Sequence, residues 1–196
     1  MYDHITTYSG IHIVPTDPDV DRIRIEDIAH ALSLLCRGNG HVKTFFSVGQ
    51  HCLNCALEAR KRGYSDRLAM ACLLHDASEA YMSDVPRPFK QHLKGYIAAE
   101  KRLFDLIYTK YLGSPLTEEE ERRLKQIDDD LLYYDLRELL NEPQEEPAPV
   151  LGIALSYEWR TFEEVEREYL QLFHQIRQAL IEKNNRQRAG TGKSEV

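Results

Sequence analysis

His75 and Asp76 are adjacent ionisable residues at the end of an apolar run that extends from Leu68 to Leu74. Glu79 follows the pair by about one helical turn. A buried, unpaired carboxylate costs several kcal/mol, and coordination of a cation is one of the few ways to offset that cost. The pair therefore predicts half of a metal site, which residues from elsewhere in the chain must complete.

Two other residues have the right chemistry to complete such a site. His51 lies early in a segment with helical spacing of apolar residues, and Asp128 is the first of three consecutive aspartates. Apolar residues flank Asp128 at helical spacing, so its side chain is expected nearest the buried face, whereas Asp129 and Asp130 rotate away by roughly 100° and 200°. Taken alone, the histidine could be a core residue bound to a carbonyl, and the aspartates could be a solvated helix face.

Together the two histidines and two aspartates form a mixed nitrogen and oxygen donor set. Such a set suits one divalent transition metal, namely Mn²⁺, Co²⁺, Zn²⁺, Fe²⁺ or Ni²⁺, and the lack of a thiolate in it argues against a structural zinc cage. Four side-chain ligands on a six-coordinate ion would leave positions for water and a phosphate oxygen. Cys52 and Cys55 follow His51 directly, but a single CxxC is a weak zinc signal, and the βαβ context of a redox pair is missing.

Helical periodicity dominates the chain that must position these residues. The expected helices cover residues 25–36, 46–62, 65–80, 89–112, 117–140 and 161–183. Residues 1–24 are expected to be irregular, with one short extended piece, and the polar tail 184–196 is expected to be disordered. The sequence predicts an all-α fold, with a single domain over residues 1–183 built as a non-bundle helical array.

Composition narrows the possible partners. The formal net charge of −7 provides no global basic field for a nucleic-acid polymer or an anionic membrane. No apolar stretch approaches the roughly 18–20 residues that span a bilayer, and the N-terminus lacks the pattern of a signal peptide. The four cysteines lie in apolar, helix-like segments, a pattern typical of reduced, buried thiols. A cytoplasmic protein is expected.

The spacing His51, His75-Asp76, Asp128 resembles the H…HD…D signature of the HD-domain metal-dependent phosphohydrolases. The string from Asp76 to Lys90, DASEAYMSDVPRPFK, is similar to the bacterial 5′-deoxynucleotidase branch and to the related phage deoxynucleotide phosphohydrolases. Further segments that fit this branch are Ile25–Leu32, Cys36-Arg37, Asn39–His41, Ser47–His51 and Trp159 ahead of a helix. The resemblance covers the chain from about residue 5 to residue 180.

The resemblance implies roles for individual residues. It implies that the quartet His51, His75, Asp76 and Asp128 holds one divalent metal. Glu79 corresponds to the general acid or base, Asp84 to an acidic residue near the sugar, and Arg37 to a residue beside the phosphate. Lys90 and Arg87 would extend the basic lining, although both could equally be solvated. Glu79 could instead be a helix-surface partner, and Arg37 a cation favoured by a helix C-terminus.

The resemblance also implies a substrate class, the 2′-deoxyribonucleotides. The favoured activity is that of a 5′-deoxynucleotidase, which converts a deoxynucleoside 5′-monophosphate to deoxynucleoside and phosphate. The alternative is a deoxynucleoside triphosphate triphosphohydrolase, such as a dATP hydrolase, that uses the same site. A non-catalytic, nucleotide-binding HD domain is a third possibility, and a homo-oligomer is expected in each case.

Gly38 departs from the pattern of this branch, in which an aromatic residue usually follows the arginine and stacks on the base. Stacking on an aromatic side chain is worth roughly 1–3 kcal/mol per base. Either another group holds the base, for example Phe45, Phe46 or a residue of a partner subunit, or base selectivity is weak.

Overall fold

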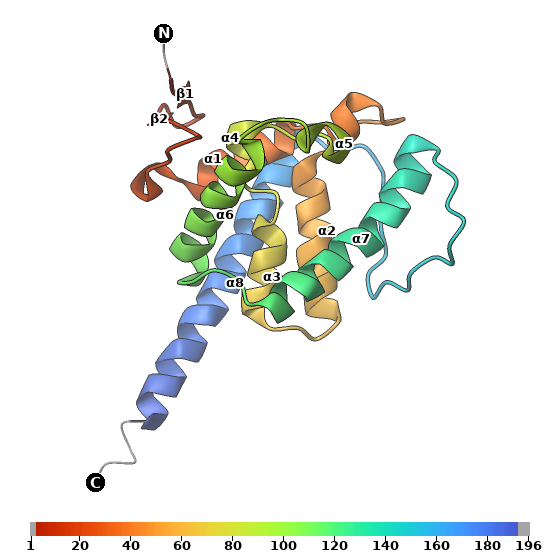
Figure 1. Cartoon of the computed structure of the whole chain (residues 1–196). Helices are drawn as coiled ribbons and strands as arrows, with labels where there is room; N and C mark the ends of the chain where they lie inside the picture. Colours follow the sequence, from red (N-terminus) through yellow and green to blue (C-terminus); the bar gives the residue numbers. More distant parts are fainter. Residues whose placement is uncertain (1–2, 192–196) are drawn as a thin grey trace.

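Helices form almost all of the regular structure in the computed structural model, which describes residues 3–191 (Figure 1). They are α1 (Ile25–Leu34), α2 (Val48–Lys61), α3 (Asp66–Leu74), α4 (Glu79–Met82), α5 (Arg87–Lys90), α6 (Tyr96–Leu112), α7 (Glu118–Leu140) and α8 (Phe162–Thr191), with the 3₁₀ turns η1 (Val20–Arg22) and η2 (Arg37–Gly40). This architecture confirms the predicted all-α, non-bundle fold. Among the residues described, no helix is both long enough and apolar enough to cross a membrane.

A small hairpin precedes the helices. Strand β1 (Ile5–Thr6) pairs antiparallel with β2 (His12–Ile13), within a segment that was expected to be irregular apart from one extended piece. Ser9, in the turn, donates from its backbone N–H and its hydroxyl to the buried carboxylate of Asp27 at 2.7 and 2.9 Å. The hairpin is therefore anchored to α1.

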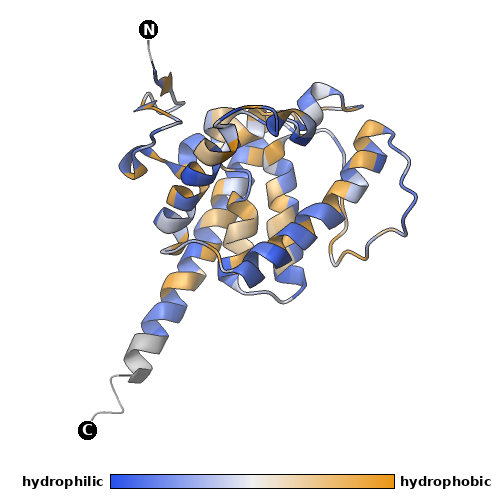
Figure 2. Cartoon of the chain, in the orientation of Figure 1, coloured by the Kyte–Doolittle hydropathy of each residue, from blue (hydrophilic) through white to orange (hydrophobic). Residues whose placement is uncertain are grey.

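The core is built around α2 and α3, which lie side by side (Figure 1) and carry the apolar residues of the interior (Figure 2). Every residue from Leu68 to Leu74 in α3 is buried. Helix α8 packs against α1 and α3, and the hydroxyl of buried Tyr169 donates to the Leu73 carbonyl at 2.6 Å. The C-terminal end of α3 is thus fixed by packing, which makes it a rigid platform for the residues that follow.

The helix expected over 65–80 is interrupted where the candidate site lies. Helix α3 ends at Leu74, and i,i+3 hydrogen bonds from Ala77 to Leu74 and from Glu79 to Asp76, each 2.9 Å, carry the chain to α4. Turns of this kind have about 3.0 residues per turn in place of 3.6, so the α-helical spacing is lost where His75, Asp76 and Glu79 lie. All three side chains nevertheless line one cavity.

The helix expected over 89–112 is in fact two helices, α5 and α6. Gly95 lies between them with φ +78°, a left-handed conformation that glycine adopts without steric cost. The chain therefore changes direction before Tyr96. This change allows α5 to contribute Lys90, and α6 to contribute Phe104, to the cavity at the end of α3.

Helix α8 extends beyond its expected end near residue 183 and runs to Thr191 (Figure 1). Glu182 accepts hydrogen bonds from Gln178 at 3.0 Å and from Arg186 at 3.5 Å, and such i,i+4 pairs support an exposed helix. The expectation of a disordered tail from residue 184 is therefore corrected up to Thr191. The rest of that expectation, residues 192–196, lies outside the described residues.

The long connection between α7 and α8 is fastened to α2 by Glu58, which is completely buried. Its carboxylate accepts from the backbone N–H groups of Gly152 and Ile153, at 3.0 Å each, and from Arg62 at 2.7 Å. The buried carboxylate thus holds this part of the connection against α2.

Replacing Glu58 by glutamine is expected to lower the free energy of unfolding by about 1–3 kcal/mol, because the amide group must face at least one of these buried donors. Denaturant titration of Glu58→Gln measures the loss. Glu142→Gln, at an exposed position of the same connection, is the matched control and should behave as wild type. Equal stability of the two variants would contradict the anchoring role.

Candidate metal centre

Three helices bring the predicted quartet together. His51 lies in the first turn of α2, whose start is fixed by a capping box between Ser47 and Gln50. His75 is the C-cap of α3, Asp76 follows it, and Asp128 lies on α7. Because α2 and α3 are adjacent and α7 packs on both, the four side chains converge at one point.

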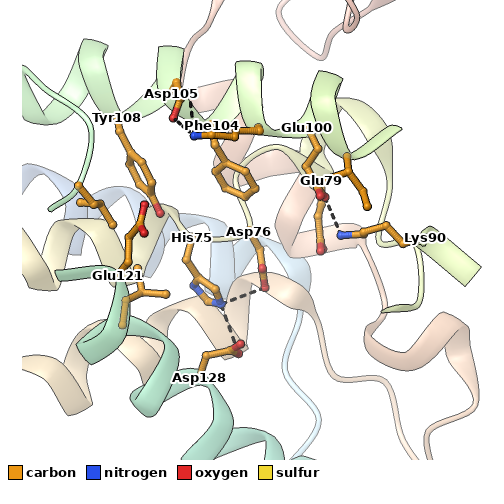
Figure 3. A pocket seen from close by; sticks show the side chains of 14 residues that line it. His75, Asp76, Glu79, Lys90, Glu100, Phe104, Asp105, Tyr108, Glu121 and Asp128 are labelled. Carbon is orange, nitrogen blue, oxygen red and sulfur yellow. Dashed lines mark hydrogen bonds and ion pairs between the residues drawn. The ribbon is translucent and has the colours of Figure 1, made fainter. Parts of the chain in front are cut away.

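Neighbouring donor atoms of the quartet have spacings suited to a shared ion. His51 Nε2 lies 3.0 Å from Asp128 Oδ1. His75 Nε2 lies 3.2 Å from Asp76 Oδ2 and 3.6 Å from Asp128 Oδ1 (Figure 3). Two atoms that are each about 2.0–2.2 Å from one ion are about 3 Å apart when they subtend a right angle. His51, His75 and Asp128 are therefore close to a coordinating arrangement, and Asp76 adjoins it through His75.

His75 provides a direct test of whether the residues fit a cation. Its Nδ1 lies 2.8 Å from the Cys72 carbonyl, which can only accept, so Nδ1 carries the hydrogen and Nε2 can offer a lone pair. Both His75 Nε2 and Asp76 Oδ2 are buried without a hydrogen-bond partner. A divalent cation would satisfy both atoms, so the residues present fit one.

Asp135 is a functional candidate that the sequence analysis missed. It is only 4% exposed, and its Oδ2 lies 3.1 Å from His51 Nδ1 and 3.0 Å from a terminal nitrogen of Arg37, while Oδ1 accepts from the Tyr157 hydroxyl at 3.0 Å. The carboxylate holds the hydrogen of His51 on Nδ1 and directs Nε2 toward Asp128. The sequence feature that could have indicated Asp135 is its spacing of two helical turns from Asp128, which places it on the same face of α7.

Asp135→Asn is expected to weaken metal binding by about 10–100-fold. The carboxylate accepts hydrogen bonds at both of its oxygens, whereas the NH₂ group of an asparagine would face one of these donors with hydrogens of its own. Competition with a chelator measures the affinity. Tyr157→Phe removes only the hydrogen bond to Asp135 Oδ1, so this variant should retain most of the metal affinity. Wild-type affinity in Asp135→Asn would show that the carboxylate does not position His51.

The electrostatics of the quartet are those of closely paired charges. Burial alone would raise the pKa of Asp76, but His75, His51 and Arg37 outweigh it and bring the pKa to about 2. Burial also opposes the ionisation of Asp128, yet the hydrogen bond with His51 and the charge of His75 hold its pKa well below the usual range. Burial would lower the pKa of His75, and Asp76 raises it well above the ordinary value. A metal must displace protons from these histidines, so its binding should strengthen with pH.

Glu79 differs from the quartet because its environment favours the neutral acid. Burial, followed by the charges of Asp76 and Asp84, raises the pKa of Glu79 to about 9. Its Oε2 is buried without a hydrogen-bond partner. The side chain lines the same cavity as His75 and Asp76 (Figure 3) and can deliver a proton there at neutral pH.

The raised pKa of Glu79 predicts how stability of the metal-free protein depends on pH. The unfolded chain releases this proton near the ordinary pKa of 4.5, whereas the folded chain keeps it up to about 9. Between these values the folded state holds the extra proton, so the Glu79 contribution to the free energy of unfolding falls as pH rises, by up to about 1.4 kcal/mol per unit. Glu79→Gln should therefore gain stability relative to wild type from about pH 5 to about pH 9. Denaturant titrations in chelator measure this difference, and a constant value would contradict it.

Two cavities meet at the quartet and share Asp76, Glu79, Lys90 and Asp128. The first, of about 540 Å³, lies against α6 and α7, and its acidic and aromatic lining is drawn in Figure 3. The lining residues beyond the shared set include Glu100, Phe104, Asp105, Tyr108 and Glu121. The second, of about 360 Å³, is more basic and aliphatic, and it includes Arg37, Asp84, Arg87, Leu136 and Leu140.

The residues expected to bind substrate all line the second cavity. Arg37 is already paired there, at 3.0 Å from Asp135 and 3.7 Å from Asp76, and Lys90 contacts Glu100 at 2.6 Å. Burial raises the pKa of Asp84, and the charge of Arg37 offsets part of that shift. The structure thus brings these three residues together, and their roles toward a substrate stay predictions.

Gly38 lies in the wall of the second cavity with φ +58°. An added Cβ would be 3.5 Å from a Leu140 methyl and 3.7 Å from Val42, so aliphatic side chains surround the point where a side chain would begin. Phe46, one of the expected substitutes, is fully buried and packs against Tyr157 at a ring separation of 5.3 Å. It is therefore not available to stack on a base.

Comparison with known proteins identifies relatives but no activity. No protein-family model matches the chain. The uncharacterized protein YfdR of Escherichia coli K12 is 38% identical over 107 residues, which are 55% of this chain and 57% of YfdR. An uncharacterized protein of Rhodobacter capsulatus is 36% identical over 108 residues, which are 53% of this chain and 55% of that relative. The chain therefore spans about half the length of the curated relatives it matches.

Proposed function

We propose that the protein is a metal-dependent phosphohydrolase that cleaves the 5′-phosphate ester of 2′-deoxyribonucleotides, with deoxynucleoside 5′-monophosphates as the preferred substrates. The observation that carries this proposal is the quartet of two buried histidines, His51 and His75, and two partly buried aspartates, Asp76 and Asp128, beside the buried carboxyl group of Glu79. The resemblance to HD-domain phosphohydrolases supports the same conclusion.

The quartet would hold the metal, and Asp135 would orient His51 within it. A bound divalent ion would offset phosphate charge and lower the pKa of a water molecule held beside it. Arg37 lies within 3.7 Å of Asp76 and adds a second positive charge at the point where the cavities meet. Its pairing with Asp135 restricts the guanidinium, so it can bind a phosphate oxygen with little further loss of freedom.

Glu79 supplies the proton that the reaction requires. As water adds to phosphorus and the ester bond breaks, the leaving 5′-oxygen takes the proton of Glu79 and departs as a hydroxyl. Glu79 then regains a proton from the water that attacked. Its neutral form in the free protein prepares it for the first of these steps.

The two cavities favour a monophosphate over a triphosphate. The second cavity would take the nucleoside, with Asp84 toward the sugar and aliphatic residues toward the base. A triphosphate tail would extend from the quartet into the first cavity, past Glu100, Asp105 and Glu121. Like charges repel a polyphosphate in this region, and the nearby Lys90 and Lys101 are already paired with carboxylates.

A panel of nucleotides tests the proposal. Protein loaded with Mn²⁺ or Co²⁺ is incubated with deoxynucleoside mono- and triphosphates and with the matching ribonucleotides, and phosphate and triphosphate are quantified. We expect phosphate release to be fastest from the deoxynucleoside monophosphates. Preferred release of triphosphate would overturn the substrate assignment, and an inert protein, indistinguishable from Glu79→Ala across the panel, would overturn the enzymatic one.

A further inference from the structure

Cys55 is a buried thiol that the proposed reaction does not use. It follows His51 by four residues on α2, so the two side chains lie on the same helix face. Its Sγ is 3.5 Å from His51 Nε2, which is the ring nitrogen that faces Asp128. The thiol is therefore on the ligand side of the imidazole.

The position of Cys55 matches that of a donor atom. A sulfur about 2.3 Å and a nitrogen about 2.0–2.1 Å from one ion are about 3.6 Å apart at a tetrahedral angle. Donor atoms of His51, Cys55, His75 and Asp128 all lie within 4.8 Å of one another. His75 Nε2, in the same group, is buried without a hydrogen-bond partner. This unpartnered nitrogen also indicates that a ligand belongs at this place.

Cys52 is equally buried and forms a second group with His75 and Asp76, whose donor atoms also lie within 4.8 Å of one another, but it approaches His75 from the other side of the ring. Its Sγ is 3.9 Å from His75 Nδ1, and that nitrogen is the one whose hydrogen goes to the Cys72 carbonyl. Cys52 therefore lies behind the imidazole, away from the lone pair on Nε2. The chain thus offers a matched control for any experiment on Cys55.

We propose that the Cys55 thiolate is a ligand of the metal centre, together with His51, His75 and Asp128, and that it selects a thiophilic divalent ion such as Zn²⁺, Fe²⁺ or Co²⁺ over Mn²⁺ or Mg²⁺. On binding, the thiol loses its proton to solvent as the sulfur–metal bond forms, and nothing is oxidised or reduced. The inference rests on the metal site of the proposed function but not on its reaction. It adds a thiolate to the donor set expected from the sequence, which contained none, and Asp76 stays beside His75 Nε2 at 3.2 Å.

X-ray absorption at the zinc edge tests the ligand directly, without any assay of activity. Zinc-loaded wild type and Cys52→Ser should show a sulfur scatterer at about 2.3 Å beside nitrogen and oxygen at about 2.0–2.2 Å. Cys55→Ser should show only nitrogen and oxygen. The ratio of Zn²⁺ to Mn²⁺ affinity, from competition titrations, should fall at least about tenfold in Cys55→Ser and stay unchanged in Cys52→Ser.

The outcomes separate this inference from the proposed function. A wild-type protein that binds one zinc ion through nitrogen and oxygen alone would overturn the role of Cys55 and leave the quartet intact. A sulfur signal that disappears in Cys52→Ser rather than in Cys55→Ser would overturn it as well. A wild-type protein that binds no metal would remove both proposals. The wild-type spectrum decides the point even if Cys55→Ser fails to fold.

Discussion

Replacement of Asp128 by asparagine is expected to reduce metal affinity by more than about 100-fold, while the same replacement at Asp129 leaves the affinity unchanged. Asp128 Oδ1 lies within 3.6 Å of the Nε2 atoms of both His51 and His75, so it bridges the donors from α2 and α3. Asp129 is a neighbour in sequence only, because its carboxylate is 2.7 Å from Lys125 on the exposed side of α7. Elemental analysis after loading and desalting measures the metal retained by each variant.

A thermal unfolding series gives an independent measure of the same prediction. A ligand that binds only the folded state stabilises it by about 2.7 kcal/mol at 100 times its Kd. Wild type and Asp129→Asn should therefore melt at a higher temperature when metal is added, and Asp128→Asn should not. Equal metal content or equal stabilisation in the two variants would show that the wrong aspartate had been assigned.

Glu79→Gln is expected to slow phosphate release by about 10²–10⁴-fold without loss of metal. The amide preserves the size of the side chain but has no acidic proton to give the leaving oxygen. Glu121→Gln, in the wall of the first cavity, is the matched control and should retain nearly full kcat. Unchanged kcat in Glu79→Gln, with the metal retained, would exclude Glu79 as the proton donor.

The dependence of kcat on pH in the wild-type protein should also reveal Glu79 as the proton donor. Only the protonated form of Glu79 can donate, so kcat should decline as pH rises through its pKa in the loaded complex. A bound cation stabilises the carboxylate and therefore places that pKa below the value of about 9 in the metal-free protein. The residual rate of Glu79→Gln should lack this alkaline decline.

Part of the candidate metal site could be predicted from the sequence because His75, Asp76 and Asp128 have local signals, whereas His51 was chosen with the help of the resemblance to the HD-domain pattern. Helical spacing distinguishes Asp128 from Asp129 and Asp130, and an apolar run of core residues leads directly to His75. These arguments need only the period of a helix and the cost of a buried charge. The structure places His51 and His75 within 3.6 Å of Asp128, and Asp76 within 3.2 Å of His75, while their role as metal ligands stays a prediction.

Asp135 could not be predicted in the same way because its role depends on distant partners. It contacts His51, 84 residues earlier, and Tyr157, which lies in a connection without regular structure. From the sequence alone, a single aspartate on a long, charged helix is most simply a solvated residue. The position of Cys55 was also hidden, because a CxxC spacing does not reveal which sulfur faces a neighbouring imidazole.

The break after Leu74 was missed for a different reason. The apolar period continues smoothly through residues 65–80, and no glycine or proline marks the change. The chain switches there to i,i+3 hydrogen bonds, and His75, Asp76 and Glu79 line a common cavity. Helix interruptions of this kind are common at functional sites and leave little trace in the pattern of apolar residues.

The most direct test of the central claim is product analysis with a deoxynucleoside 5′-monophosphate and protein of measured metal content. Metal-loaded wild type should release deoxynucleoside and phosphate in equal amounts, and both chelator-treated wild type and Asp128→Asn should release neither above background. Failure of the fully loaded protein to release phosphate from any nucleotide would contradict the assignment of this centre as a phosphohydrolase.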